Sequence, residues 1–373
     1  MKYYIIAGEA SGDLHASNLM KELKRQDATT DFRCFGGDLM EAQGARLVKH
    51  YRDLDFMGFI EVLLNIRTIL RNMKLCKQDI LSFKPDVLIL VDYPGFNLRL
   101  AKFASENGIR VFYYISPQVW AWKRSRVHKI KKYVERMYVI LPFEQDFYDK
   151  FDYEVDFVGH PLLDAIGPEK EGGDSFRNEE ALDERPVIAV LPGSRKQEIR
   201  KMLPVMMGML NHFPDHQFII AGAPSSPEQV YEHALKDDRV KLVKGKMHDL
   251  LRVAEAAMVT SGTATLETAL FRVPEVVCYK GGWLSYAIAR RLVKDIKYIS
   301  LVNLIMDREV VKELIQGDFN EKKLHKELSR LVTDGSYRSQ MLADLDILHE
   351  KLGGPGASAS AAELMYRRLG DGA

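Results

Sequence analysis

The sequence predicts an α/β protein with two doubly wound parallel-sheet domains and a helical C-terminus. Short apolar segments alternate with helical patterns along most of the chain, which is typical of parallel strands joined by crossover helices. The 373 residues exceed what one ordinary core holds. A polar, glycine-rich stretch at 166–185 separates two such alternations, so we expect domains at 1–165 and 186–350 with a linker between them.

The first alternation opens with an apolar strand at 2–8, followed by the small-residue loop 8–13 and a helical pattern from Leu14. Such a loop lets a ligand approach the backbone and points helix amides at an anion. It lacks the spacing of dinucleotide, phosphate-loop and hydrolase-elbow fingerprints. A binding loop and a plain tight turn therefore both remain open.

A second strand, at 86–92, runs through five apolar residues and ends in Asp92. A buried parallel strand of this kind delivers its last side chain to the carboxyl edge of the sheet, where ligands bind in open α/β folds. Asp92 fits poorly as a helix cap because a cap bonds amides two or three residues ahead, and Asn97 is the better cap. We therefore predict a functional carboxylate.

The second alternation places two further small-residue loops after strands. The strand at 186–191 leads into Ser194 and Arg195, and the strand at 257–260 leads into Ser261. Ser261 can cap a helix whose first amides Gly262 leaves exposed. From Leu284 onward the pattern is mostly helical. The last helix falls within 351–373, and the sequence leaves open whether it crosses back to the first domain, as it often does in two-domain transferases.

The composition excludes several classes of protein. Lys and Arg number 53 against 52 for Asp and Glu, which argues against a general nucleic-acid binder. Three scattered cysteines without metal-ligand spacing suit a reducing cytoplasm. The apolar segment at the start is too short for a signal peptide, and no run approaches the ~18 apolar residues of a membrane span.

Seven motifs together resemble the lipid-A-disaccharide synthase family over nearly the whole chain. They are GEASGD at 8–13, MGFIEV at 57–62, VDYPGFN at 91–97, SPQVWAW at 116–122, LPGSR at 191–195, SGTATLE at 261–267 and SLVNL at 300–304. The resemblance implies a glycosyltransferase of the GT-B type, in which two Rossmann-like domains face a cleft. Many relatives carry an acid where this chain has Gly95, so Asp92 stands without a second carboxylate there.

The family's reaction joins UDP-2,3-diacylglucosamine to 2,3-diacylglucosamine 1-phosphate. It gives the β-1,6-linked lipid A disaccharide 1-phosphate and UDP with inversion, and it serves lipopolysaccharide synthesis in Gram-negative bacteria. The resemblance implies no metal and no other cofactor. The expected partners are acylated glucosamine lipids, UDP and an anionic membrane, at the inner face of the inner membrane. A homodimer remains open.

The chemistry assigns roles to the motif residues. Attack by a sugar hydroxyl needs a base, for which Asp92 is the first candidate. His15, with an ordinary pKa of about 6.5, and Glu9 are its rivals beside the first loop. Arg195 can bind a diphosphate through two hydrogen bonds, and the helix start near Gly262 can add amides. The full set expected to bind substrate or UDP is Ser11, Gly12, Ser194, Arg195, Ser261, Gly262, Thr263, Ala264, Glu267 and Asn303.

Two of these assignments carry alternatives. Glu267, one turn into its helix, is placed to accept from ribose hydroxyls, but it could equally be a solvated or helix-pairing residue. Asn303 enters by resemblance only. Two other classes of protein stay open as well. One is another UDP-N-acetylglucosamine-type transferase or epimerase of the same fold, and the other is a non-catalytic nucleotide-sugar sensor at a membrane.

The segment 59–77 combines an unusually wide apolar face with a basic edge. Only Glu61 is acidic there, against Arg67, Arg71, Lys74 and Lys77. Because acylated substrates cannot pass cheaply through water, we expect a helix lying in an anionic membrane surface, assisted by the basic cluster at 123–132. The alternative is an ordinary amphipathic core helix. The predicted membrane-contact residues are Phe59, Ile60, Leu63, Leu64, Arg67, Ile69, Arg71 and Lys74.

Overall fold

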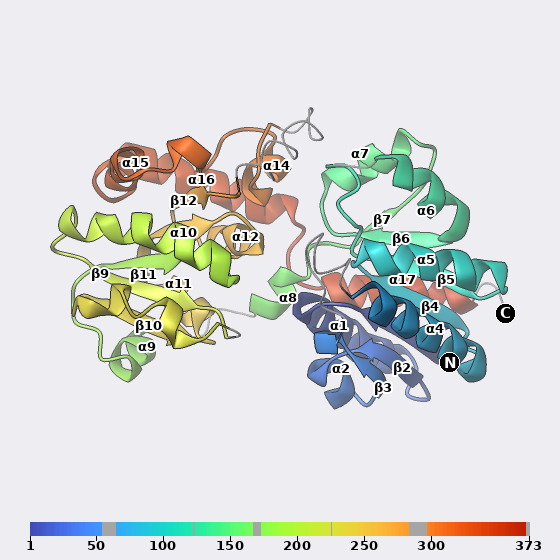
Figure 1. The fold of residues 1–373 in the computed structure, drawn as a ribbon. Helices are drawn as coiled ribbons and strands as arrows, with labels where there is room; N and C mark the ends of the chain where they lie inside the picture. The colour runs from blue at the N-terminus through green and yellow to red at the C-terminus, as the bar shows by residue number, and fades with distance from the viewer. Residues whose placement is uncertain (54–64, 122–123, 167–172, 225, 283–296, 371–373) are drawn as a thin grey trace. The chain divides into compact units, whose positions relative to one another are not determined.

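A computed structural model describes residues 1–53, 65–121, 124–166, 173–224, 226–282 and 297–370 (Figure 1). The chain forms two compact units. Unit 1 contains Met1–Ala165 together with Leu352–Ala373, and unit 2 contains Ile166–Lys351. Each unit has one parallel sheet with helices against it, so the predicted pair of doubly wound Rossmann-like domains with a helical C-terminus is confirmed.

Unit 1 holds a seven-stranded sheet in the order β3-β2-β1-β4-β5-β6-β7. Its strand order reverses between β1 and β4, which pair in parallel from Tyr3 beside Val87 to Ala7 beside Val91. The strands are β1 (Lys2–Ala7), β2 (Asp31–Gly36), β3 (Arg46–His50), β4 (Val87–Val91), β5 (Arg110–Tyr114), β6 (Arg136–Val139) and β7 (Asp156–Phe157).

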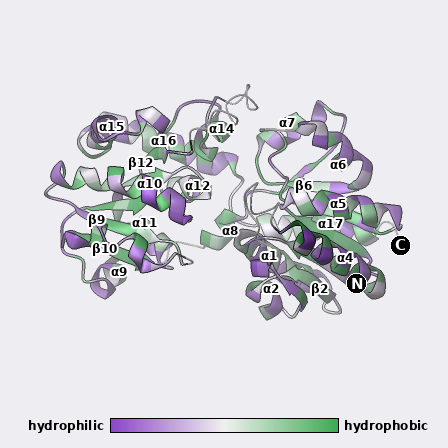
Figure 2. Ribbon diagram, viewed as in Figure 1, coloured by the Kyte–Doolittle hydropathy of each residue, from purple (hydrophilic) through white to green (hydrophobic). Residues whose placement is uncertain are grey.

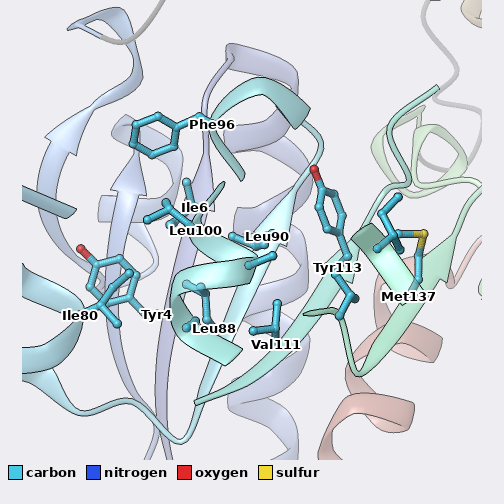
Figure 3. Close-up of a cluster of buried hydrophobic side chains, with 14 of the residues drawn as sticks. Tyr4, Ile6, Ile80, Leu88, Leu90, Phe96, Leu100, Val111, Tyr113 and Met137 are labelled. Carbon is cyan, nitrogen blue, oxygen red and sulfur yellow. The ribbon is translucent and has the colours of Figure 1, made fainter. Parts of the chain in front are cut away.

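Alternate residues of these strands contribute side chains to two hydrophobic cores, one on each face of the sheet, because successive side chains in a strand point to opposite faces. Tyr4, Ile6, Leu88 and Leu90 pack with helices α4 (Ile66–Phe83), α5 (Pro94–Glu106) and α6 (Val127–Tyr133). Figure 3 shows part of this core, with Ile80 of α4 and Leu100 of α5 beside the strand residues. Tyr3, Ile5, Val87 and Ile89 pack with α1 (Ala10–Gln26) and α17 (Ala357–Gly370) on the other face. Smaller helices of this unit are α2 (Asp38–Ala42), α7 (Phe143–Asp149) and α8 (Leu162–Ile166).

Helix α17 belongs to unit 1 although the whole of unit 2 precedes it in the chain. Asp164 fixes its start, since the carboxylate accepts hydrogen bonds from the backbone N–H groups of Gly356 at 2.5 Å and Ser358 at 2.8 Å. Ala361, Ala362 and Met365 are then fully buried in the core beside α1. The last helix thus completes the sheet's second face.

Unit 2 repeats the topology with six parallel strands in the order β10-β9-β8-β11-β12-β13. The strands are β8 (Val187–Leu191), β9 (Gln217–Gly222), β10 (Val240–Lys244), β11 (Ala254–Thr260), β12 (Glu275–Tyr279) and β13 (Lys312–Ile315). The helices are α9 (Gly173–Glu179), α10 (Lys196–Met207), α11 (Met247–Val253), α12 (Thr263–Leu270), α14 (Leu301–Met306), α15 (Glu321–Thr333) and α16 (Gly335–Lys351).

The stretch expected to be a linker contains helix α9, whose Phe176 is buried in the core of unit 2. Figure 2 shows hydrophilic and hydrophobic residues mixed along the helices that cover each sheet. None of the helices within the described ranges is long and apolar enough to cross a membrane.

Candidate functional site

In each unit, the site motifs follow the two central strands at which the strand order reverses. A crevice opens at such a reversal because the connections leave to opposite sides of the sheet. Glu9 follows β1 and Asp92 follows β4 in unit 1. Arg195 follows β8, and Ser261 follows β11, in unit 2. The topology therefore places the predicted residues of each unit at its expected ligand-binding edge.

The backbone that carries Asp92 is strained and tightly held. Asp92 and Tyr93 have φ angles of 42° and 47°, in the left-handed region that costs of order 1–3 kcal/mol for non-glycine residues. The Asn97 side-chain amide donates to the carbonyl oxygens of Val91 at 3.1 Å and Asp92 at 2.8 Å. The Tyr113 hydroxyl donates to the Asp92 carbonyl as well. These bonds hold the backbone from which the Asp92 side chain projects.

Asn97 does not cap helix α5, and the sequence-based expectation that it would is wrong. The helix begins at Pro94 with Tyr93 as its N-cap, so Asn97 lies inside the first turns. Its amide is used as a donor to the end of β4 instead of an acceptor for helix amides.

Burial raises the pKa of the Asp92 carboxyl from its ordinary value of 3.8 to about 7, and the negative charge of Glu9 adds to the effect. Both causes disfavour the charged form. A carboxyl with such a pKa is half ionised near neutral pH, where a general base works best. The two carboxylates that the sequence placed after β1 and β4 are therefore electrostatic neighbours.

The loop 8–13 is helical from Ala10 onward, since α1 begins there and not at Leu14. Ser11 is exposed on the first turn, whereas Gly12 is buried, where an added Cβ would lie 3.2 Å from the Cβ of Ala7. A side chain on Gly8 would collide with the ring of Tyr93 at 2.4 Å. The small residues thus let the helix start close to the β4 turn.

Asp13, the acid that closes this loop, has a structural role. Its carboxylate accepts hydrogen bonds from the backbone N–H groups of Gly37 at 2.8 Å, Leu39 at 3.1 Å and Met40 at 3.2 Å. These bonds hold the start of α2 against α1.

His15 lies buried rather than exposed, with 7% of its surface accessible. His160 is an electrostatic neighbour of His15. Burial lowers the pKa of His160 to about 3, and the charge of His15 adds to the effect. The His160 ring accepts from the Leu162 N–H through Nδ1 at 3.3 Å, so Nε2 carries its proton. Sequence analysis missed His160, although the Gly-His-Pro sequence after a strand was an available signal.

A second missed residue is Glu144, which supports the loop that begins at Ser116. Burial raises the pKa of Glu144 to about 8, while Ser116 and Trp120 lower it from nearby. Its carboxylate accepts from the Leu141 N–H at 3.1 Å. The Ser116 hydroxyl lies 2.8 Å from that of Tyr148. No pattern in the sequence distinguished this glutamate from a solvated one.

In unit 2, Arg195 is the N-cap residue of α10, and its side chain is 62% exposed. Its guanidinium lies 3.5 Å from the Glu198 carboxylate. Gly193 has a φ of 102°, and a Cβ there would approach Glu198 at 2.8 Å, so glycine is required. Ser194 is exposed, and its carbonyl oxygen accepts from the Ser226 hydroxyl at 3.2 Å.

The loop after β11 exposes a helix start, as expected, but Ser261 does not cap it. The N-cap of α12 is Gly262, and the Ser261 hydroxyl donates to the Ile299 carbonyl at 3.3 Å. Gly262 and Thr263 are exposed and Ala264 is half-buried. Backbone amides at such a helix start suit an anion.

Glu267 lies mostly buried on α12, with 17% of its side chain exposed. Its carboxylate is 3.6 Å from Nε2 of His248, a residue of α11 that sequence analysis missed. The pair joins two helices, and it also fixes where the carboxylate lies.

Asn303 uses its whole side chain within unit 2. The amide nitrogen donates to the Val311 carbonyl at 2.8 Å and to Glu313 at 3.0 Å. The amide oxygen accepts from the N–H groups of Val310 and Val311. Glu313 also accepts from Ile299 and Ser300. Asn303 therefore positions the loop that contacts Ser261.

Half of the predicted membrane-contact residues, Phe59, Ile60, Leu63 and Leu64, lie outside the described residues. Arg67, Arg71 and Lys74 are exposed on α4, and Ile69 is half-buried. The helix also exposes 41% of Ile66 and 55% of Leu70, while Met73 and Ile80 face the core. Its outer surface thus carries apolar and basic side chains together.

No group of three or more His, Cys, Asp or Glu side chains among the described residues is arranged to hold a metal ion. The expectation of a metal-independent reaction stays a prediction.

The fold defines a class of two-domain protein that includes glycosyltransferases and sugar-nucleotide epimerases. The glycosyltransferase of kitacinnamycin matches with a TM-score of 0.68 and 15% identity over 99% of both chains. The UDP-GlcNAc 2-epimerase from Neisseria meningitidis, solved with UDP-GlcNAc, matches with a TM-score of 0.61 and 12% identity over 100% of both chains.

The family is more specific than the fold. Residues 3–361 match the model of the lipid-A-disaccharide synthetase family. The lipid-A-disaccharide synthase of Syntrophus aciditrophicus is 40% identical over 96% of this chain and 95% of its own. That of Geobacter sulfurreducens is 39% identical over 98% and 97%. The chain belongs to the lipid-A-disaccharide synthase family of glycosyltransferases, as its motifs indicated.

Proposed function

We infer that this glycosyltransferase joins UDP-2,3-diacylglucosamine to 2,3-diacylglucosamine 1-phosphate, forming the β-1,6-linked lipid A disaccharide 1-phosphate and UDP with inversion. Membership of the family supports the reaction. The observation that carries the mechanism is Asp92, a strained and partly buried carboxyl at the strand-order reversal, whose pKa is raised to about 7.

In this mechanism Asp92 is the general base. The acceptor's 6-hydroxyl oxygen forms a bond to the anomeric carbon of the donor sugar. The bond from that carbon to the diphosphate oxygen breaks, and its electron pair leaves with UDP. The hydroxyl proton passes to Asp92, a transfer typically worth ~10²–10⁴-fold in rate. Burial, with the charge of Glu9 added to it, keeps the pKa of Asp92 high, and His15 is the rival base.

Unit 2 supplies the groups for UDP. Arg195 and the amides at Gly262, Thr263 and Ala264 stabilise the diphosphate, because a guanidinium and a helix start both favour anions. Ser194 and Ser261 shape the two loops, and Glu267, oriented by His248, accepts from ribose hydroxyls. Ser11 and Gly12 in unit 1 line the acceptor side, and Asn303 acts through the loop that it holds.

Membrane contact through α4 is part of the proposal. Exposed Ile66 and Leu70 beside Arg67, Arg71 and Lys74 suit a helix in the interface of an anionic bilayer. The acylated substrates would then reach the enzyme without crossing water, at the inner face of the inner membrane.

The test is a mass-spectrometric assay of the purified chain with both acylated sugars. We expect the disaccharide 1-phosphate and UDP in equal amounts. No disaccharide should form when one of the two substrates is left out. The epimerases among the solved structures of this fold make UDP-sugar epimerisation the second candidate. Conversion of a UDP-sugar without any acceptor, and no disaccharide, would favour it. Slow release of UDP with every acceptor tested would favour the non-catalytic nucleotide-sugar sensor.

A further inference from the structure

Unit 1 contains a groove on the outer side of the helices that cover one face of its sheet. It encloses about 670 Å³ and is lined by residues of α4, α5 and α6. Helix α5 contacts both of the other helices, so the groove has a fixed frame (Figure 1). Neither Glu9 nor Asp92 is among the residues that line it.

The groove is strongly basic. Among the described residues, five permanent cations and one carboxylate line it, the cations being Lys77, Arg99, Lys102, Lys129 and Lys132. The carboxylate is that of Glu106, which lies 3.7 Å from Lys102. Like charges gathered from three helices repel one another, and a concave wall focuses their field on an anion. The chain as a whole is nearly neutral, so this excess is local.

The walls between these charges are apolar. Leu98, Phe103 and Tyr133 line the same groove and are half-buried. The Lys77 ammonium lies over the Phe103 ring at 4.9 Å, and the Lys132 ammonium lies over the Tyr133 ring at 5.3 Å from its centroid. The rings hold the two ammonium groups at the groove walls. A ligand with an anionic head and an apolar body matches this lining better than a free inorganic anion.

The groove also continues the exposed stripe of α4. At 100° per residue, Ile66, Leu70 and Lys77 fall within about 40° of one another around the helix. Leu70 and Lys77 are about 10 Å apart along the axis, at ~1.5 Å per residue. Exposed apolar side chains and the basic groove therefore share one face of α4.

We propose that this groove binds the phosphate headgroup of an anionic phospholipid, which would fix one depth and orientation of unit 1 on a bilayer. The inference rests on the membrane contact of α4 in the proposed function, which brings the lipid to the groove. It adds a defined binding site to the diffuse attraction between basic side chains and an anionic bilayer. Glycosyl transfer itself does not depend on it.

The test compares vesicles of equal charge and different headgroup. One set contains phosphatidylcholine with phosphatidylglycerol, and the other contains phosphatidylcholine with enough oleate to give the same measured zeta potential. We expect the unaltered chain to bind the phospholipid vesicles at least fivefold more tightly in a flotation assay. Phosphatidylcholine is common to both sets, so they differ in whether the net negative charge comes from an anionic phospholipid headgroup or from a carboxylate. Equal binding to both sets would overturn the proposal, because diffuse attraction does not distinguish these two groups.

Variants then locate the site. Arg99→Gln with Lys129→Gln should weaken binding to the phosphatidylglycerol vesicles at least tenfold. The control, Lys21→Gln with Lys150→Gln, removes the same charge from exposed positions outside the groove and should stay within twofold. Equal losses in the two pairs would contradict a site. Glu106→Gln, which removes the lining carboxylate, should tighten binding, and a weakening there would also contradict it.

A soluble competitor identifies the source of the phosphate. Glycerol 3-phosphate at millimolar concentration should displace the chain only weakly from the vesicles. Full displacement would show that a soluble phosphate ester is the ligand and would overturn the lipid assignment. If the unaltered chain forms the disaccharide but shows no headgroup preference, the groove proposal fails while the proposed function stands.

Discussion

The two units share one strand order, yet their central strand ends carry opposite charge. In unit 1 the residues after β1 and β4 are Glu9 and Asp92, and the pKa of Asp92 rises to about 7 because burial and its neighbour disfavour the anion. In unit 2 the corresponding strand ends lead to Arg195 and to the exposed start of α12. The same topology thus offers a proton acceptor in one unit and an anion site in the other.

Asp92→Asn should produce the largest effect, because it removes basicity with little change in volume. We expect turnover to fall by ~10²–10⁴-fold while UDP affinity stays within twofold. The measurement is the rate of disaccharide formation together with calorimetric titration of UDP. Activity within a few-fold of the parent would move the base to His15 or Glu9.

Arg195→Ala should weaken UDP binding and slow transfer together, by roughly 10- to 100-fold. A charge-assisted hydrogen bond to a phosphate is typically worth ~1.5–3 kcal/mol. Arg200→Ala is the matched control, since Arg200 is exposed on the same helix. If both variants bind UDP as the parent does, Arg195 is a surface ion-pair residue of Glu198.

Ile66→Ser with Leu70→Ser should release the chain from anionic vesicles by several-fold without lowering its melting temperature by more than a few degrees. Both side chains are largely exposed, so the fold does not depend on their burial. Leu235→Ser with Ile347→Ser makes an equivalent change on exposed positions of unit 2. Equal release by the control pair would place the membrane surface elsewhere.

Asp92→Asn should also stabilise the fold at pH 8 relative to pH 5. A carboxyl whose pKa rises from 3.8 to about 7 binds its proton more tightly when folded, so stability falls as pH rises through that window. At about 1.4 kcal/mol per pKa unit, the gain at pH 8 is at most about 4 kcal/mol. Chemical denaturation at both pH values measures it, and an equal change at both would contradict a raised pKa.

The sequence predicted the buried strands of both sheets well, because continuous apolar runs such as 87–91 leave few other structures. It missed β3, an edge strand whose Arg46, Lys49 and His50 interrupt the apolar pattern. It also missed β13, a four-residue strand in a region expected to be helical, because Lys312 and Glu313 interrupt its apolar pattern. Short edge strands bury few apolar side chains, so their composition does not distinguish them from loops or helices.

The candidate site was predicted in part, and the missing parts depend on contacts between distant residues. Strand ends pointed to Asp92, Arg195 and Gly262 because local pattern places them there. The supports His160, Glu144 and His248 act through neighbours brought together only by folding. The failed caps were wrong for two different reasons. Asn97 bonds backward to the end of β4 and not forward to helix amides. Ser261 bonds to Ile299, a distant residue that only folding brings near.

The most direct test of the account is the pH profile of kcat/KM for disaccharide formation by the parent and by Glu9→Gln. The profile reports the pKa of the essential base in the free enzyme. The parent should gain activity as pH rises through about 7, and Glu9→Gln should shift that limb to lower pH because a negative neighbour is lost. A parent profile that is flat between pH 5 and 8, or an unmoved limb in Glu9→Gln, would contradict Asp92 as the base beside Glu9.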